Sequence, residues 1–85
     1  MKQFSYVLTN KDALQCRPMG NLMREASRFS SRVSVVNGTR AACLREIRDL
    51  MNLDMQCGNR VTVTVEGKDE EAAVAAIQNY FVANM

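Results

Sequence analysis

The residues with the clearest chemical potential lie in one short segment, Leu-Gln-Cys-Arg-Pro at positions 14–18. Pro18, the only proline, suits the first turn of a helix, because its missing N–H costs no hydrogen bond there and its φ is already helical. We expect the N–H groups of Met19 and Gly20 to lack partners within that helix. Together with the positive end of the helix dipole and the Arg17 guanidinium, these N–H groups would form an anion-binding site, here called the seat, for a group such as a phosphoryl group.

Two residues beside this seat decide what chemistry it could support. Gln15 precedes it, but a carboxamide cannot carry a phosphoryl group, because its nitrogen lone pair is delocalised into the carbonyl. Cys16 is next to Arg17 at the helix start, an environment that can lower a thiol pKa below about 8.5. No base and no resolving cysteine lie nearby in the sequence. We assign Cys16 no catalytic role, but we expect it to react faster than Cys43, because Cys16 is at an exposed helix start and Cys43 is in a strand.

The composition excludes several other kinds of site. The chain contains no histidine, which rules out a phosphohistidine, a Cys–His nucleophilic pair and histidine metal ligands. Its three cysteines, at 16, 43 and 57, match neither a disulfide framework nor a Cys-x-x-Cys metal pair. We therefore expect a reducing cytoplasm, and neither a metal nor a cofactor. Cys43 is predicted to be a small core residue in an inward-packing strand, and Cys57 to be incidental in a loop.

The chain as a whole has the composition of one small globular domain over residues 1–85. It is 47% hydrophobic and 24% charged, and its net charge of +2 is too small to indicate nucleic acid by itself. No apolar run approaches the roughly 20 residues of a membrane span, and the first five residues lack a signal-peptide core.

Four strands are predicted. Alternating hydrophobicity marks residues 2–8 and residues 59–66 as half-buried strands. Between them, Asn37-Gly38 is the preferred pair of a two-residue type I′ turn, since both positions need a positive φ, and it predicts a hairpin of residues 32–36 and 39–43. The inward side chains of the two outer segments would be Phe4, Tyr6 and Leu8, and Val61, Val63 and Val65.

Three amphipathic helices complete the chain. Helical spacing of apolar residues predicts them over about 16–29, about 45–53 and from Asp69 onward. Asp69 is expected to cap the last helix, with Glu70 and Glu71 complementing its dipole. The core stripe of that helix would be Ala73, Val74, Ile77, Tyr80 and Phe81. The order βαββαβα predicts an α+β open-faced sandwich, with a four-stranded antiparallel sheet and three helices on one face.

Residues 14–18 resemble the active-site segment Leu-His-Thr/Ala-Arg-Pro of the HPr family, the phosphocarriers of the bacterial sugar phosphotransferase system. The resemblance runs over nearly all 85 residues, including the Asn37-Gly38 pair, residues 50–53 and residues 66–70. Gln15 is closer still to the Crh-like paralogues, which read Leu-Gln-Ala-Arg-Pro. The resemblance implies an HPr-like sandwich and the strand order of that family.

In the HPr family the histidine accepts phosphate from enzyme I. Because Gln15 replaces it, the resemblance implies a non-catalytic regulatory protein of the phosphotransferase system and carbon catabolite control that acts by protein contact. One alternative is a phosphocarrier that uses Cys16; another is a degenerate paralogue without any phosphotransfer role. Arg17, which in the family neutralises the phosphoryl group, is then either a surviving contact residue or a relic.

The resemblance also implies a regulatory position and a docking surface. The family pattern Leu-Lys-Ser-Ile-Met places Glu46 where Gram-positive members phosphorylate a serine, although a one-residue shift would put Arg45 there. A glutamate at a helix start also has an ordinary structural explanation, because its charge complements the helix dipole and stabilises the helix by about 0.3–1 kcal/mol. A partner would be a catabolite-control transcriptional regulator, a phosphotransferase component or a metabolic enzyme, with no direct contact to nucleic acid or membrane. The implied docking residues are Arg17, Gly20, Arg24, Arg45, Ile47, Arg48 and Met51.

Helical spacing leaves the role of two of these docking residues open. Ile47 and Met51 are as consistent with the core as with a surface. Leu50 and Leu53 take the inward positions of the helix more convincingly, which leaves Ile47 and Met51 at the margin, where a partner could cover them.

Overall fold

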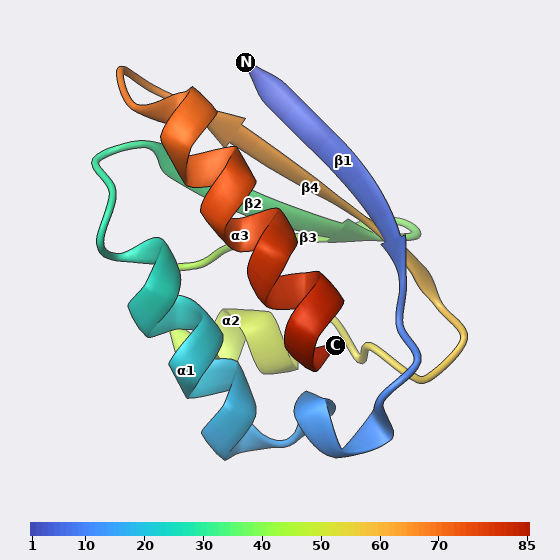
Figure 1. The fold of residues 1–85 in the computed structure, drawn as a ribbon. Coiled ribbons are helices and arrows are strands. Elements are labelled where there is room, and N and C mark those ends of the chain that lie inside the picture. The colour runs from blue at the N-terminus through green and yellow to red at the C-terminus, as the bar shows by residue number, and fades with distance from the viewer.

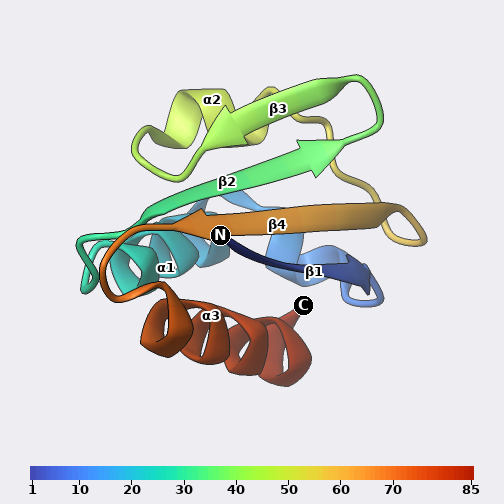
Figure 2. The same ribbon diagram turned by 90° about the horizontal axis from the view of Figure 1, so that it is seen from above.

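The computed structural model describes residues 1–85 as a four-stranded antiparallel sheet covered on one face by helices (Figures 1 and 2). The strand order is β1-β4-β2-β3. This confirms the predicted α+β sandwich, with one short 3-10 helix added before α1. The elements are β1 Lys2–Val7, η1 Lys11–Leu14, α1 Cys16–Ala26, β2 Arg32–Asn37, β3 Arg40–Cys43, α2 Ile47–Met51, β4 Arg60–Glu66 and α3 Glu70–Asn84.

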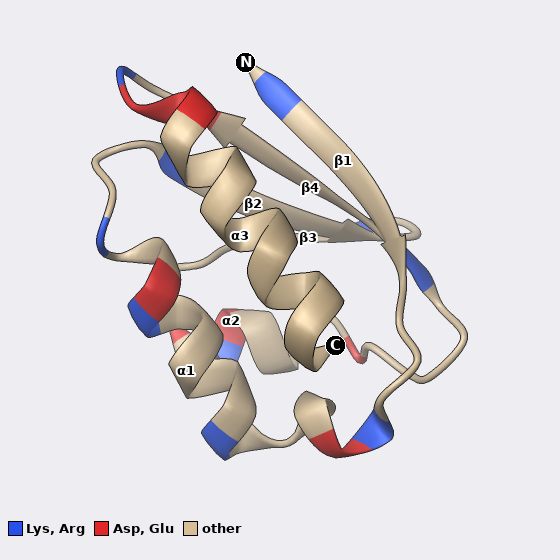
Figure 3. Ribbon diagram, in the orientation of Figure 1, with Lys and Arg blue, Asp and Glu red and all other residues tan.

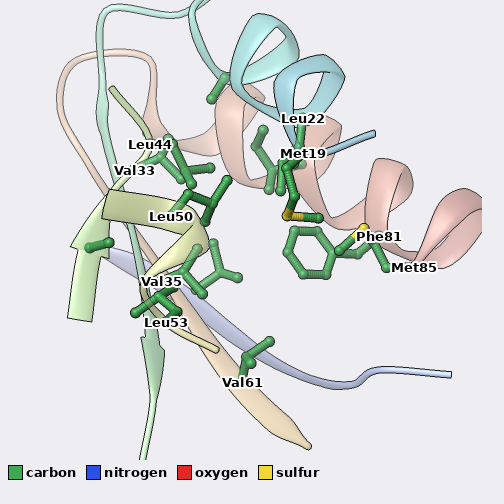
Figure 4. Close-up of a cluster of buried hydrophobic side chains, with 14 of the residues drawn as sticks. Met19, Leu22, Val33, Val35, Leu44, Leu50, Leu53, Val61, Phe81 and Met85 are labelled. Atoms are coloured by element: carbon green, nitrogen blue, oxygen red, sulfur yellow. The ribbon is translucent and has the colours of Figure 1, made fainter. Parts of the chain in front are cut away.

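The core lies between the sheet and the helices, as the alternating strand patterns predicted. Val61, Val63 and Val65 of β4 are fully buried, while the threonines between them face the open side of the sheet. From α3, Phe81 meets the rings of Phe4 and Tyr6 edge-on, with centroids 5.5 and 5.6 Å apart. Figure 4 shows how side chains from α1, α2 and α3 converge on the strands. The predicted stripe of α3 is confirmed, with Ala73, Ile77 and Phe81 buried and Val74 and Tyr80 packed against the core.

The hairpin is confirmed, but its predicted turn is wrong by one residue. Asn37 pairs with Arg40 across the ladder, so the two turn residues are Gly38 and Thr39. Of these only Gly38 has a positive φ, 64°, which fits a type II′ turn rather than type I′. Asn37 stays in β2 because its side-chain amide donates to the Leu53 carbonyl oxygen at 3.0 Å, a contact that no local pattern encodes.

Two helices are shorter than their periodicity predicted. α1 ends at Ala26 instead of Phe29, because the chain tightens there into i→i+3 bonds, from Arg28 N–H to the Glu25 oxygen and from Phe29 N–H to the Ala26 oxygen. α2 begins only at Ile47, because the Arg45 N–H bonds the Cys43 oxygen in a turn and Glu46 is extended.

Asp69 precedes α3 as predicted, but its side chain makes no capping bond. Its carboxylate instead accepts hydrogen bonds from the main-chain N–H groups of Ser30 and Ser31, each at 2.9 Å, and from the Ser31 hydroxyl. These bonds hold the pKa of the Asp69 carboxyl below its ordinary value, the Ser31 hydroxyl being the largest cause. Asp69 therefore ties the start of α3 to the segment between α1 and β2.

Cys43 is not the core residue that the sequence predicted. Its neighbour Ala42 is buried, so alternation along β3 turns Cys43 to the open face of the sheet. There its sulfur accepts from Arg32 Nε at 3.3 Å and lies 3.8 Å from the Ser34 hydroxyl. The hydrogen bond from Arg32 lowers the pKa of the Cys43 thiol against the opposing effect of partial burial.

Candidate functional site

The segment 14–18 forms the start of α1. Gln15 is the residue before the helix, extended at φ −83° and ψ 164°, and its exposed side chain makes no capping bond. Its carbonyl oxygen accepts from the Met19 N–H at 3.1 Å. The helix therefore begins two residues before Pro18, and the expected seat at Met19 and Gly20 is wrong in register. The N–H groups without a helical partner are those of Cys16 and Arg17, since Pro18 has none.

The start of α1 is supported by contacts from α3 and from the loop that precedes it. The Tyr80 hydroxyl donates to the Pro18 carbonyl oxygen at 3.4 Å, and burial raises the pKa of that phenol. In the loop before α1, the Asn10 side chain accepts a hydrogen bond from the Asp12 N–H at 3.1 Å. This bond caps the 3-10 helix η1, which leads into Gln15. The sequence pattern places Tyr80 only in the core stripe of α3; no local pattern indicates its bond to Pro18, which is 62 residues away.

The side chains at this helix start are free of intramolecular ties. Cys16 and Arg17 are exposed, and the three ion pairs of the molecule involve neither Arg17 nor Arg24. In Figure 3 the basic residue at the start of α1 stands at the lower end of the helix, without an acidic residue on the same turn. Free N–H groups and an unpaired guanidinium can attract an anion, but the carboxamide of Gln15 offers no nucleophile to receive one.

The second predicted position, Glu46, lies directly before α2. It is exposed and extended, its carbonyl oxygen accepts from the Leu50 N–H at 3.2 Å, and its side chain makes no capping bond. Arg45, the alternative occupant in the alignment, is also exposed. Both side chains are thus presented to solvent at the start of a short helix.

The predicted docking residues share one region because α1 and α2 are neighbours on the helical face (Figure 1). Leu50 and Leu53 are buried, Ile47 is half-buried and Met51 is 39% exposed, which confirms that the last two lie at the margin of the core. Gly20 is half-buried on α1, with nothing within 4 Å of the position where a Cβ would be. The remaining members, Arg17, Arg24, Arg45 and Arg48, are all exposed.

No cluster of three metal-ligating side chains is present, and no helix is long and apolar enough to cross a membrane.

The chain matches the family model described as the PTS HPr component phosphorylation site over residues 2–83. Among curated relatives, the phosphocarrier protein HPr of Mycoplasma capricolum is 30% identical over 82 residues, covering 96% of this chain and 92% of the relative. The HPr-like protein Crh of Halalkalibacterium halodurans is 33% identical over 67 residues, covering 79% of this chain and 80% of the relative. The crystal structure of HPr from Thermoanaerobacter tengcongensis superposes with a TM-score of 0.91 at 31% identity, over 99% of this chain and 94% of that one.

Proposed function

The chain belongs to the HPr family of the phosphotransferase system, and from that premise we propose that it is a non-catalytic regulatory member acting by protein–protein contact. The observation that carries this proposal is Gln15, which occupies the residue before α1 where the family pattern has its histidine. We take residues 1–85 as a single domain working in the bacterial cytoplasm. Its partner would be a catabolite-control transcriptional regulator, a phosphotransferase component or a metabolic enzyme.

The chemical part of the proposal is tested with enzyme I and phosphoenolpyruvate. The protein should gain no acid-labile, alkali-stable phosphate, because a carboxamide nitrogen is not nucleophilic. Gln15→His should recover transfer, since the free N–H groups and Arg17 surround the same position. Intact-mass spectrometry gives the stoichiometry. Stoichiometric phosphate on the unaltered protein would refute the non-catalytic role, and a label on Cys16 would establish a cysteine phosphocarrier in its place.

The contact part of the proposal rests on the exposed arginines of α1 and α2 and on Glu46. Unpaired guanidinium groups are available to a partner's carboxylates, and Ile47 and Met51 offer partly exposed apolar surface between them. Glu46 would act as a fixed substitute for the family's regulatory phosphoserine, with one negative charge rather than about two. The same acid should disfavour docking onto enzyme I.

Affinity capture from a native lysate of the source bacterium identifies the partner, and calorimetric titration then measures it. Charge-assisted hydrogen bonds contribute roughly 1.5–3 kcal/mol, so Glu46→Gln should weaken binding about ten- to a hundredfold. Salt at about 0.5 M should weaken the unaltered protein as well. Glu66→Gln, an exposed acid at the end of β4, is the matched control. Equal affinities of the protein and its Glu46→Gln variant would reduce Glu46 to a helix-start residue.

A further inference from the structure

A groove lies beside the second half of α1, and none of residues 14–18 lines it. It has a volume of about 700 Å³ and is bounded by α1, by the segment that joins α1 to β2, and by the chain leaving β3. Pockets for small organic ligands usually measure about 300–1,000 Å³, so this groove is of suitable size.

Five of its lining residues are hydrophobic, and Ser27, Ser30 and Ser31 line it as well. Val33 and Leu44 are each 5% exposed, and the N–H of Leu44, the residue after β3, donates a hydrogen bond to the Val33 oxygen at 2.9 Å. Figure 4 shows these two side chains next to each other at the edge of the core. Met23 and Phe29 line the groove from the α1 side and are only half-buried. An apolar ligand group would therefore cover surface that is now partly exposed.

The charged side chains lining the groove are all of one sign. They are Arg24 and Arg45, and no Asp or Glu lines it. Neither arginine takes part in an ion pair, and the Arg24 guanidinium has only a long contact of 3.4 Å to the Asn21 side chain. Glu25, the nearest acid along α1, is engaged by Arg28 at 2.8 Å. The groove thus combines a hydrophobic portion of its lining with two guanidinium groups that have no ion-pair partner.

We propose that this groove binds a small amphipathic anion, a phosphate monoester whose other part is a short hydrocarbon. The hydrocarbon would lie against Met23, Phe29 and Leu44, and the phosphate would accept hydrogen bonds from Arg24 and Arg45. Two guanidinium groups match the charge of a phosphate monoester, which is about −1.5 to −2 at neutral pH, better than that of a carboxylate.

The probe is hexyl phosphate, titrated into ¹⁵N-labelled protein while amide shifts are followed by NMR. Saturable shifts should centre on Phe29, Ser30 and Arg45. Inorganic phosphate and hexanol, which each supply half of the ligand, should bind at least about tenfold more weakly, and ethyl phosphate should fall between them and hexyl phosphate. Hexanoate should also bind more weakly than hexyl phosphate.

Variants separate this site from general attraction of anions. The double variant Arg24→Gln, Arg45→Gln should weaken hexyl phosphate by about tenfold or more, and both residues are exposed, so the fold should persist. Arg60→Gln, an exposed arginine at the start of β4, should leave the affinity unchanged. Shifts that do not saturate, that centre on Cys16 and Arg17, or that are equal for inorganic phosphate and hexyl phosphate would overturn the assignment. So would a double variant that binds as the unaltered protein does.

Gly20, Arg24 and Arg45 belong both to this groove and to the proposed docking surface. A bound ligand should therefore lower partner affinity, a consequence that rests on the proposed function. The ligand titration uses the protein alone, so a failure of partner docking would leave its result unaffected.

Discussion

The two ends of α1 are anchored in opposite ways. At its start, Gln15, Cys16 and Arg17 are exposed and no capping bond holds Gln15, so the local support is the Tyr80 bond to the Pro18 oxygen. At its end, the chain is tied through Ser30 and Ser31 to Asp69, 38 to 39 residues away.

The difference separates residues that are available for contact from residues that hold the shape. Ser31 is 6% exposed and its hydrogen-bonding groups are taken by Asp69, so it cannot also serve a partner. The side chains at the helix start have no such partner, so changing them should disturb the fold little. Substitutions at the two ends of the helix should therefore have opposite consequences for stability and for binding.

The largest expected effect is on stability, from Gly67→Ala. Gly67 has φ 154°, and a Cβ there would lie 2.6 Å from the Ser31 hydroxyl and 2.7 Å from its Cα. Strain and overpacking should together lower the free energy of unfolding by about 3 kcal/mol, measured by urea denaturation. The control is Gly20→Ala within α1, where a Cβ meets nothing within 4 Å and helix propensity should raise stability by roughly 0.5–1 kcal/mol. Equal losses of unfolding free energy in Gly67→Ala and Gly20→Ala would contradict the proposed contrast between the segment packed on Ser31 and α1.

A smaller loss is expected from Ser31→Ala, which removes the hydroxyl bonded to Asp69. A hydrogen bond to a charged group contributes roughly 1.5–3 kcal/mol, and the free energy of unfolding should fall by about that amount. Gln15→Ala, which removes an unbonded exposed side chain, should stay within about 0.5 kcal/mol of the unaltered protein. The same denaturation curves measure both, and a loss at Gln15 as large as that at Ser31 would contradict the comparison.

The Asp69 bonds should also make stability depend on pH. Its pKa is lowered in the folded protein, so its contribution is present above the unfolded-state value of about 3.9 and is lost as the pH falls through the folded value. Melting temperature measured from about pH 6 down to pH 2 should fall less steeply in Asp69→Asn than in the unaltered protein. Parallel curves would show that the carboxylate contributes little at this end of the helix.

The smallest effect concerns the thiols and compares the start of α1 with the open face of the sheet. Arg32→Gln should raise the pKa of Cys43, because the largest cause of its lowering is the hydrogen bond from Arg32. Iodoacetamide should then alkylate Cys43 several-fold more slowly at pH 7, while the rate at Cys16, which has no such partner, stays the same. Peptide mass mapping separates the two sites. Unchanged alkylation of Cys43 would show that Arg32 does not control it.

The sequence alone predicted the layers of this protein and the position of Gln15 at the start of a helix. Alternation in β1 and β4 and helical spacing in α1 and α3 are local patterns, because burial of one face imposes them on consecutive residues. The glutamine at position 15 and the absence of histidine likewise follow directly from the sequence.

Tertiary structure alone decided which of several local options each polar residue takes. Asn37 could have turned the hairpin, but the Leu53 carbonyl oxygen 16 residues away holds it in β2. Asp69 could have capped α3, but the Ser31 hydroxyl and two main-chain N–H groups across the molecule bind its carboxylate. The groove beside Arg24 and Arg45 likewise exists only because segments distant in sequence meet there. Hydrogen bonds of similar strength compete for each polar group, and only the packed chain determines which partner lies within reach.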